Sequence, residues 1–178
     1  PDYNRTVLTI AGEPNAVVHA AFNVIKTSFE LIDMKVHEGE HPRIGAVDVC
    51  PFVPIQNSSM DECVELAKAL GKRVFEELEL PVFFYGSAAS NKERELLSDL
   101  RKGEYESLRE RYQNGGPLLP DIGPVDYNEN IEKFGAVVIG ARGILVAYNV
   151  NLDEKDATVS KLAGTIVRST GRLIKNDS

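Results

Sequence analysis

The chain has 178 residues, enough for one domain with a sizeable core, and 43 % of them are hydrophobic, as in an ordinary globular protein. It carries 20 Lys and Arg against 27 Asp and Glu, a formal charge of −7, which argues against non-specific nucleic-acid binding. No stretch approaches the roughly 20 apolar residues of a membrane-spanning helix, and no signal segment opens the chain. Two scattered cysteines, Cys50 and Cys63, make no disulfide framework, so we expect reduced thiols in an intracellular, cytoplasmic protein.

The first part of the chain predicts a strand followed by a helix. Residues that favour strands alternate from Arg5 to Ala11. Pro14 suits the first turn of a helix. Apolar residues then recur every three or four positions up to Ile32, so we expect this helix to end near Met34. The segment from His37 to Ile44 is charged and contains glycine and proline, which predicts a loop.

The middle of the chain continues to alternate strands and helices. Residues 47–55 form an apolar run broken by two prolines, which predicts a buried strand with a disturbed end. Ser59 and Glu62 have capping-box spacing ahead of an apolar helical stripe. Residues 81–85 predict a short strand, and residues 91–111 predict one or two exposed helices.

The last part combines a long loop, a hairpin and a helix. Residues 114–132 are rich in Pro and Gly and show little periodicity, and long ordered loops are often functional. Residues 134–140 and 144–149 predict two strands joined as a hairpin at residues 141–143, and residues 159–174 predict a closing helix. The interleaved elements with this hairpin predict an α/β (α+β) fold, in which two or three helices cover one face of a mixed β-sheet.

The densest group of ionisable side chains lies between His37 and Asp48. A histidine exchanges protons near neutral pH because its unperturbed pKa is about 6.5. A neighbouring carboxylate can orient its ring, and an arginine can hold a carboxylate through two hydrogen bonds. From the residues alone, an acid–base site and a solvated charged loop both stay open. Arg5 and Arg142 are likewise open between structural and functional roles, and we interpret His19 as a boundary or surface residue.

Residues 37–41 also match H-E-x-x-H, the pattern of zinc proteases. Zinc binding of this kind needs both histidines on one helical face. Pro42 disfavours helical geometry at His41, and Gly39 lowers helix stability by about 1 kcal/mol relative to Ala. We therefore expect no metal site here. Glycine-rich phosphate motifs and a serine nucleophile elbow are absent from the sequence.

A longer motif is more specific. The stretch from Gly39 to Pro54, which reads GEHPRIGAVDVCPFVP, resembles the signature of the glutamate formiminotransferase family, in its amino-terminal subdomain. Further similar segments lie in the family's order and extend the resemblance over nearly the whole chain; they are Asn4–Val7, Leu31–Met34, Asp61–Cys63, Pro81–Gly86, Gly103–Glu106, Pro120–Pro124, Gly140–Arg142 and Asn149–Leu152.

The resemblance implies an α/β fold of two similar subdomains with folate in a channel between them. It implies transfer of a formimino group from N-formimino-L-glutamate to tetrahydrofolate in histidine degradation, without a metal, by a homodimer when full length. It implies that His41 is the catalytic acid–base residue, that Arg43 holds a substrate carboxylate and that Arg142 contacts an anion. The segment that follows the P-D-x-G-P turn is expected to contact folate through Gly123, Pro124, Tyr127, Phe134 and Gly135.

We interpret residues 1–178 as this amino-terminal subdomain, truncated at both ends and without the second subdomain. Two alternatives stay open beside formimino transfer. One is a noncatalytic folate-binding module, which a single subdomain favours. The other is a relative that acts on 5-formyltetrahydrofolate, which the motif cannot separate from the first. The loop from Gly123 to Gly135 departs from the family's pattern, so its individual folate contacts stay open.

Overall fold

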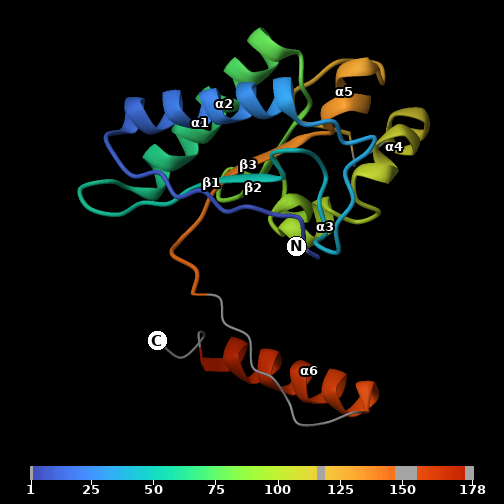
Figure 1. Cartoon of the computed structure of the whole chain (residues 1–178). Coiled ribbons are helices and arrows are strands. Elements are labelled where there is room, and N and C mark those ends of the chain that lie inside the picture. Colours follow the sequence, from blue (N-terminus) through green and yellow to red (C-terminus); the bar gives the residue numbers. More distant parts are fainter. Residues whose placement is uncertain (1, 116–118, 147–155, 175–178) are drawn as a thin grey trace. The chain divides into compact units, whose positions relative to one another are not determined.

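The computed structural model describes residues 2–115, 119–146 and 156–174, with the side chains of 157 and 168–174 left aside. The chain divides into two units, Pro1–Ile144 and Leu145–Ser178 (Figure 1). The first unit contains a β-sheet with helices on its faces, and the second contains one helix, α6 (Ala157–Ile174).

The first unit is built on a three-stranded parallel sheet with the order β1-β3-β2. The strands are β1 (Val49–Phe52), β2 (Val82–Gly86) and β3 (Val137–Ala141). Both edges of β3 form ladders, one with β1 and one with β2. β3 is buried along its whole length, as expected of a parallel strand covered on both faces. The predicted α/β class is confirmed.

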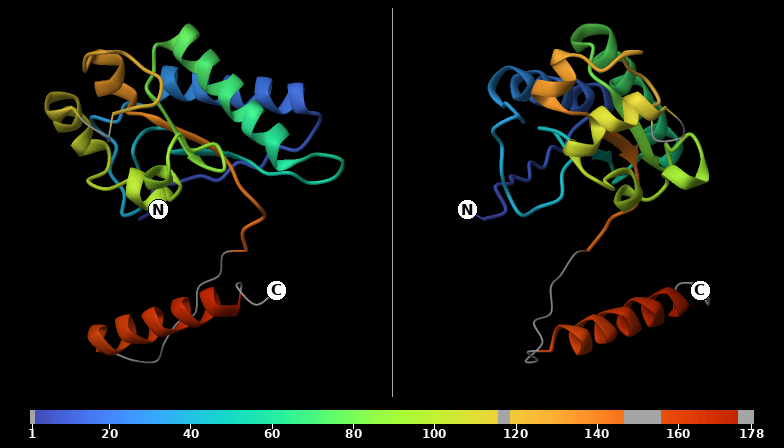
Figure 2. Two further views of the ribbon diagram at one scale, coloured as in Figure 1. Left: turned by 180° about the vertical axis from the view of Figure 1, so that it is seen from behind. Right: turned by 90° about the vertical axis from the view of Figure 1, so that its right-hand side faces the viewer.

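The two long helices, α1 (Pro14–Leu31) and α2 (Met60–Leu78), pack on one face of the sheet (Figure 2). The predicted capping box begins α2, because Ser59 Oγ accepts the Glu62 N–H at 3.1 Å and Glu62 Oε2 accepts the Ser59 N–H at 2.7 Å. Burial of one large apolar side chain contributes about 1.5–3 kcal/mol. Fully buried side chains in this layer include Phe22, Ile25, Leu70, Val74, Phe134 and Ile139.

Short helices cover the opposite face, whereas the sequence predicted exposed helices over residues 91–111 and a sheet covered on one face only. They are η1 (Lys92–Arg94), α3 (Leu97–Leu100), η2 (Tyr105–Ser107), α4 (Leu108–Asn114) and α5 (Glu129–Phe134). Apolar residues at helical spacing predicted helix over residues 91–111, but they did not show that it is divided into short helices. Together they bury a second apolar cluster that includes Phe83, Tyr85, Leu100, Leu108, Ile131 and Val138.

Two buried arginines fasten these short helices. Arg94 Nη1 donates to Asp121 Oδ2 at 2.8 Å, and Arg111 Nη2 donates to the Leu100 carbonyl at 2.9 Å. Both side chains are almost fully buried, so their bonds offset the cost of removing a charge from water. Burial lowers the pKa of Arg111, whose described partners are carbonyls and the Ser107 hydroxyl.

Two predicted strands are wrong for the described residues. Residues 5–10 form no ladder, and Val7 and Leu8 are 70 % and 65 % exposed. Alternation produces a strand only where a partner edge is available. The hairpin is wrong because β1 and β2 occupy both edges of β3, so the following segment cannot pair with it. Residues 144–146 are exposed without regular structure, and 147–149 lie outside the described residues. Described antiparallel pairing is confined to isolated bridges.

The second unit bears out the predicted closing helix. Asp156 Oδ1 accepts the Thr158 N–H at 2.7 Å ahead of α6. Val159, Leu162 and Ile166 are exposed on it. Among the helices that the structure describes, none is long and apolar enough to span a membrane.

Candidate functional site

The predicted acid–base loop connects α1 to β1, and its histidines do not lie on a helix. Residues 37–41 have irregular backbone, as the sequence indicated. The loop's end is fixed to the sheet, because the Ile44 N–H donates to Asp48 Oδ1 at 3.0 Å and Gly45 pairs with Gly135. Gly135 has φ +83°, and a Cβ there would lie 2.6 Å from the Cα of Gly45. Glycine is therefore required where the loop contacts the start of β3.

His41 is a half-buried imidazole held in one tautomer. Its Nδ1 lies 2.7 Å from the Pro42 carbonyl oxygen, and its Nε2 contacts Arg5 Nη1. A carbonyl can only accept a hydrogen bond and a guanidinium can only donate one. Nδ1 therefore carries the proton and Nε2 presents a lone pair. A backbone carbonyl orients this ring, in place of the neighbouring carboxylate that the sequence suggested.

The amino-terminal stretch brings Arg5 to His41. The Asp2 carbonyl accepts the Glu40 N–H at 3.0 Å, and Asn4 Nδ2 donates to the Glu38 carbonyl at 2.7 Å. His37 Nε2 lies 3.2 Å from the Asn4 carbonyl oxygen. These bonds join two segments more than thirty positions apart in the chain. Arg5, whose role the sequence left open, is thus the cationic side chain that contacts His41 in the described structure.

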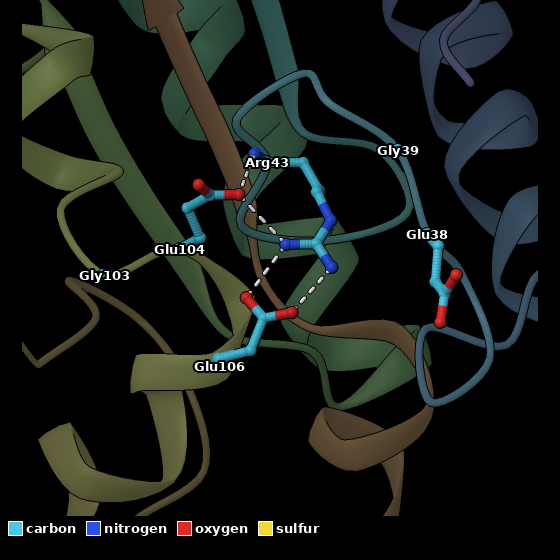
Figure 3. A pocket seen from close by; sticks show the side chains of 6 residues that line it. All are labelled: Glu38, Gly39, Arg43, Gly103, Glu104 and Glu106. Carbon is cyan, nitrogen blue, oxygen red and sulfur yellow. Dashed lines mark hydrogen bonds and ion pairs between the residues drawn. The ribbon is translucent and has the colours of Figure 1, made fainter. Parts of the chain in front are cut away.

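Arg43 is held by two carboxylates from the η2 turn (Figure 3). Glu106 accepts two hydrogen bonds, at 2.8 Å and 2.7 Å, while Glu104 Oε2 accepts from Nη1 at 3.0 Å. Hydrogen bonding to Arg43 lowers the pKa of Glu106, and the bond to Glu106 in turn raises the pKa of Arg43. The guanidinium is thus already engaged by internal anions, so a substrate carboxylate would have to displace them.

The space beside Arg43 is an open pocket of about 420 Å³. Glu38 and Gly39 line it from the acid–base loop, and Gly103, Glu104 and Glu106 line it from the facing turn. Figure 3 shows Glu38 on one side of Arg43, with Glu104 and Glu106 on the other side. Three carboxylates and one guanidinium line this pocket, so its net negative charge favours a cationic group over an anionic one.

The segment expected to contact folate, residues 123–135, follows a turn that Asp121 holds to β2, and its residues differ in exposure. Asp121 Oδ2 accepts the Phe84 N–H at 2.8 Å, which fixes the turn before Gly123 and Pro124, both half-buried. Tyr127 is half-buried too, with its ring edge-on to Tyr112 at 5.9 Å between centroids and Arg109 over it at 4.8 Å.

Phe134 lies in the core and not on a ligand surface. Its side chain has no exposure, and its ring meets Phe29 edge-on at 5.8 Å between centroids. The sequence predicted a strand beginning at Phe134, and this is wrong, because Phe134 is the last residue of α5. Gly135 is also buried, at its contact with Gly45. Neither residue can touch folate in this conformation.

Arg142 lies at the other end of β3 from the acid–base loop. Gly135, which pairs with Gly45 of the loop, precedes β3, and Arg142 follows it. The Arg142 N–H donates to the Phe52 carbonyl at 3.1 Å, and Nη1 donates to the Gly143 carbonyl at 3.0 Å. The structure thus does not bring Arg142 together with Arg43.

Within the described ranges, no three His, Cys, Asp or Glu side chains converge as a metal site. His37 and His41 bond to carbonyls and to Arg5. Cys50 and Cys63 are free thiols, as predicted.

Comparison with known proteins agrees with the motif-based resemblance. Residues 1–142 match the formiminotransferase domain, N-terminal subdomain. The chain is 49 % identical over 152 residues to the formimidoyltransferase-cyclodeaminase of Rattus norvegicus, which covers 85 % of this chain and 27 % of that protein. It is 44 % identical over 171 residues to the glutamate formimidoyltransferase of Thermoplasma acidophilum, covering 95 % of this chain and 55 % of that protein.

A more distant relative is the formiminotransferase cyclodeaminase-like protein of Arabidopsis thaliana, 30 % identical over 168 residues, or 86 % of this chain and 55 % of that protein. The chain spans 27 % to 55 % of the length of these relatives. With the family match over residues 1–142 and the parallel α/β sheet, the chain belongs to the formiminotransferase family, in the region of its N-terminal subdomain.

Proposed function

We propose that this chain takes part in transferring a formimino group from N-formimino-L-glutamate to tetrahydrofolate, giving 5-formiminotetrahydrofolate and glutamate. Membership of the family supports the reaction class, and relatives named glutamate formimidoyltransferase support the donor. The observation that carries the proposal is the tautomer of His41, which presents the Nε2 lone pair as a base.

In the proposed reaction His41 moves one proton in each direction. The folate nitrogen attacks the formimino carbon, and Nε2 accepts the proton that this nitrogen loses as the new C–N bond forms. The bond from the same carbon to the glutamate nitrogen then breaks, and His41 returns the proton to that leaving amine. The Pro42 carbonyl stabilises the ring throughout, because it accepts from Nδ1 in both protonation states.

Arg5 must withdraw from Nε2 before the base can act. Its exposed side chain can do so without disturbing the core, and substrate binding would supply the displacement. We further propose that Gly123, Pro124 and Tyr127 line the folate, since all three retain exposed surface. For Arg43 we propose a supporting role, in which its ion pairs fix the acid–base loop to the η2 turn. Assembly of the full-length protein as a homodimer stays a prediction.

The test is an assay of formimino transfer with the wild-type chain and His41→Ala. We expect the substitution to lower the rate at least about 100-fold, the low end of a general acid–base contribution. His19→Ala is the matched control, because His19 lies on the exposed side of α1 near Arg73, and its rate should not change.

Equal rates for His41→Ala and wild type would remove His41 from the mechanism. Folate binding without turnover in the wild-type chain would contradict transfer by this chain and favour the noncatalytic module. Conversion of 5-formyltetrahydrofolate, with no use of formiminoglutamate, would assign the chain to the relatives that act on 5-formyltetrahydrofolate.

A further inference from the structure

One peptide unit, between Pro42 and Arg43, connects the proposed base to a carboxylate. Its C=O belongs to Pro42, lies 2.7 Å from His41 Nδ1 and accepts the proton that this nitrogen carries. Its N–H belongs to Arg43 and donates to Glu104 Oε2 at 3.2 Å (Figure 3). Because the C=O and N–H of a trans peptide lie in one plane and point in opposite directions, Glu104 holds from one side the group that holds His41 from the other.

The Glu104 carboxylate is itself fixed at this peptide by the rest of Arg43. The same oxygen, Oε2, also accepts from Arg43 Nη1 at 3.0 Å. The Arg43 carbonyl accepts the Tyr105 N–H at 2.9 Å, so the turn that carries Glu104 is bonded to the backbone on the other side of the same arginine. The Pro42–Arg43 peptide therefore cannot rotate without breaking its bond to Glu104.

The backbone of Glu104 is strained. Its φ is +55° and its ψ is −158°, in a region that is essentially restricted to glycine. Other residues persist there only when their surroundings hold them, and such strain gathers at functional sites. A glycine would relieve the strain but would supply no carboxylate. The glutamate thus lowers the stability of its own backbone, and what it provides is the set of bonds to Arg43.

The orientation of this peptide matters most when the base is free to act. While Arg5 contacts Nε2, its guanidinium also favours the tautomer with the proton on Nδ1. Once Arg5 withdraws, as the proposed reaction requires, the Pro42 carbonyl is the remaining described contact that selects this tautomer. A carboxylate that accepts from the N–H of the same peptide makes its carbonyl a stronger acceptor, because hydrogen bonds in a chain polarise one another.

We propose that Glu104 is a positioning residue for the base. It orients and polarises the Pro42–Arg43 peptide, whose carbonyl keeps the proton of His41 on Nδ1 and its lone pair on Nε2. The inference rests on the proposed function, because a base that acts through Nε2 requires this tautomer. Glu104 acts through the peptide and does not touch the reacting atoms.

The test measures the tautomer of His41 from the ¹⁵N chemical shifts of its ring in the full chain, at about pH 8.5, where an ordinary histidine is neutral. His41→Ala identifies the resonances. The compared proteins all carry Arg5→Ala, which removes the other contact that favours the Nδ1–H tautomer. We expect Glu104→Gly to lower the ratio of the Nδ1–H to the Nε2–H tautomer about fivefold, the effect of one hydrogen bond. Glycine suits the positive φ, so this variant should fold.

Three further variants separate this role from general damage to the loop. Glu104→Gln should restore most of the ratio, because an amide oxygen can still accept the Arg43 N–H. Glu104→Ala retains the backbone strain and should match Glu104→Gly, since both lack the carboxylate. Glu106→Gln is the matched control and should not change the ratio, because the described side-chain bonds of Glu106 go to the Arg43 guanidinium and not to the peptide.

Formimino transfer then connects the tautomer to the reaction. With Arg5 restored, Glu104→Gly should lower kcat about fivefold, in step with the tautomer ratio, and change the KM for formiminoglutamate little. An unchanged ratio in Glu104→Gly, an equal fall in Glu106→Gln, or a loss confined to KM would overturn the role of Glu104. A wild-type chain that transfers no formimino group would contradict the proposed function, and the tautomer ratio would still decide whether Glu104 positions His41.

Discussion

The pair formed by Arg43 and Glu106 makes the acid–base loop sensitive to low pH. The pKa of Glu106 falls below 4.5 in the folded chain, so the folded state binds fewer protons there than the unfolded state. The stability that this carboxylate contributes is present above pH 4.5 and is lost as the pH falls through its folded pKa. Because Glu106 is 61 % exposed, added salt should weaken the effect as well.

We therefore expect Glu106→Gln to lower the free energy of unfolding more at pH 7 than at pH 3. Urea unfolding of both proteins at the two pH values measures this difference. Glu95→Gln serves as the control, because Glu95 is exposed and forms no ion pair with a described residue. A difference between Glu106→Gln and wild type that grows towards pH 3 would contradict the sign of the shift.

At the residue scale, local sequence predicted the backbone around His41 better than the contacts of the neighbouring arginines. Pro42 indicated irregular backbone at His41, which the structure has, whereas the catalytic role of His41 stays a prediction. The partners of Arg43 could not be predicted, because Glu104 and Glu106 lie 61 and 63 positions further along the chain. No local pattern distinguishes an arginine that binds substrate from one that pairs internally. Arg5 was left open for the same reason, since only folding brings it to His41.

At the scale of elements, the approach of α2 to β2 depends on Gly71. A Cβ there would lie 2.7 Å from Cζ of Phe84, whose ring is 7 % exposed and cannot swing aside. Alanine favours a helix over glycine by about 1 kcal/mol, whereas overpacking a core costs about 1–3 kcal/mol. We expect Gly71→Ala to be destabilising overall, measured as a lower melting temperature.

Gly164→Ala is the matched control for that substitution. Gly164 also lies within a helix, α6, but a Cβ there would meet nothing within 4 Å. Only the propensity gain of about 1 kcal/mol remains, so the helical signal in circular dichroism should not fall. A melting temperature for Gly71→Ala at or above that of the wild type would show that Phe84 can yield.

Local patterns predicted most elements, including the short strand β2, but not how they pair or which face of the sheet they cover. The three- and four-residue spacing of apolar side chains located α1, and the capping box located the start of α2. The helix α5 was missed because it has only six residues, most of which lie within the segment 114–132 that was predicted to be a loop. Strand prediction failed where pairing decides the outcome: alternation at residues 5–11 found no partner, and β3 had no free edge for a hairpin.

At the scale of the whole molecule, residues 5–10 carry apolar side chains that nothing in the described structure covers. Val7 is 70 % exposed, and Leu8 and Ile10 are 65 % and 43 % exposed. Extended, alternating and unpaired backbone of this kind favours association with other chains. We expect the chain to self-associate as its concentration rises, and Val7→Lys to reduce that association, as measured by light scattering.

Val125→Lys is the control, because Val125 is 91 % exposed in the long loop and outside the alternating segment. Val125→Lys adds the same charge as Val7→Lys but should change association less. An equal reduction in both variants would indicate that net charge, and not the segment around Val7, governs association.

The interpretation of residues 1–178 as one subdomain stays a prediction. The family match covers residues 1–142, and the two units of the structure meet after Ile144.

The central position of β3 determines when the protein can fold. The strands β1 and β2 do not pair with each other, because β3 lies between them. In the chain, β3 comes after all the described helices of the first unit. During synthesis, almost the whole of the first unit must therefore leave the ribosome before any strand finds a partner, because β3 begins at Val137 and the unit ends at Ile144. Closing such distant contacts is slow. The long helices α1 and α2 can form earlier, with their apolar faces uncovered. Nascent chains paused before Val137 should for this reason bind chaperones that recognise apolar surface, and should be released once Ala141 has emerged.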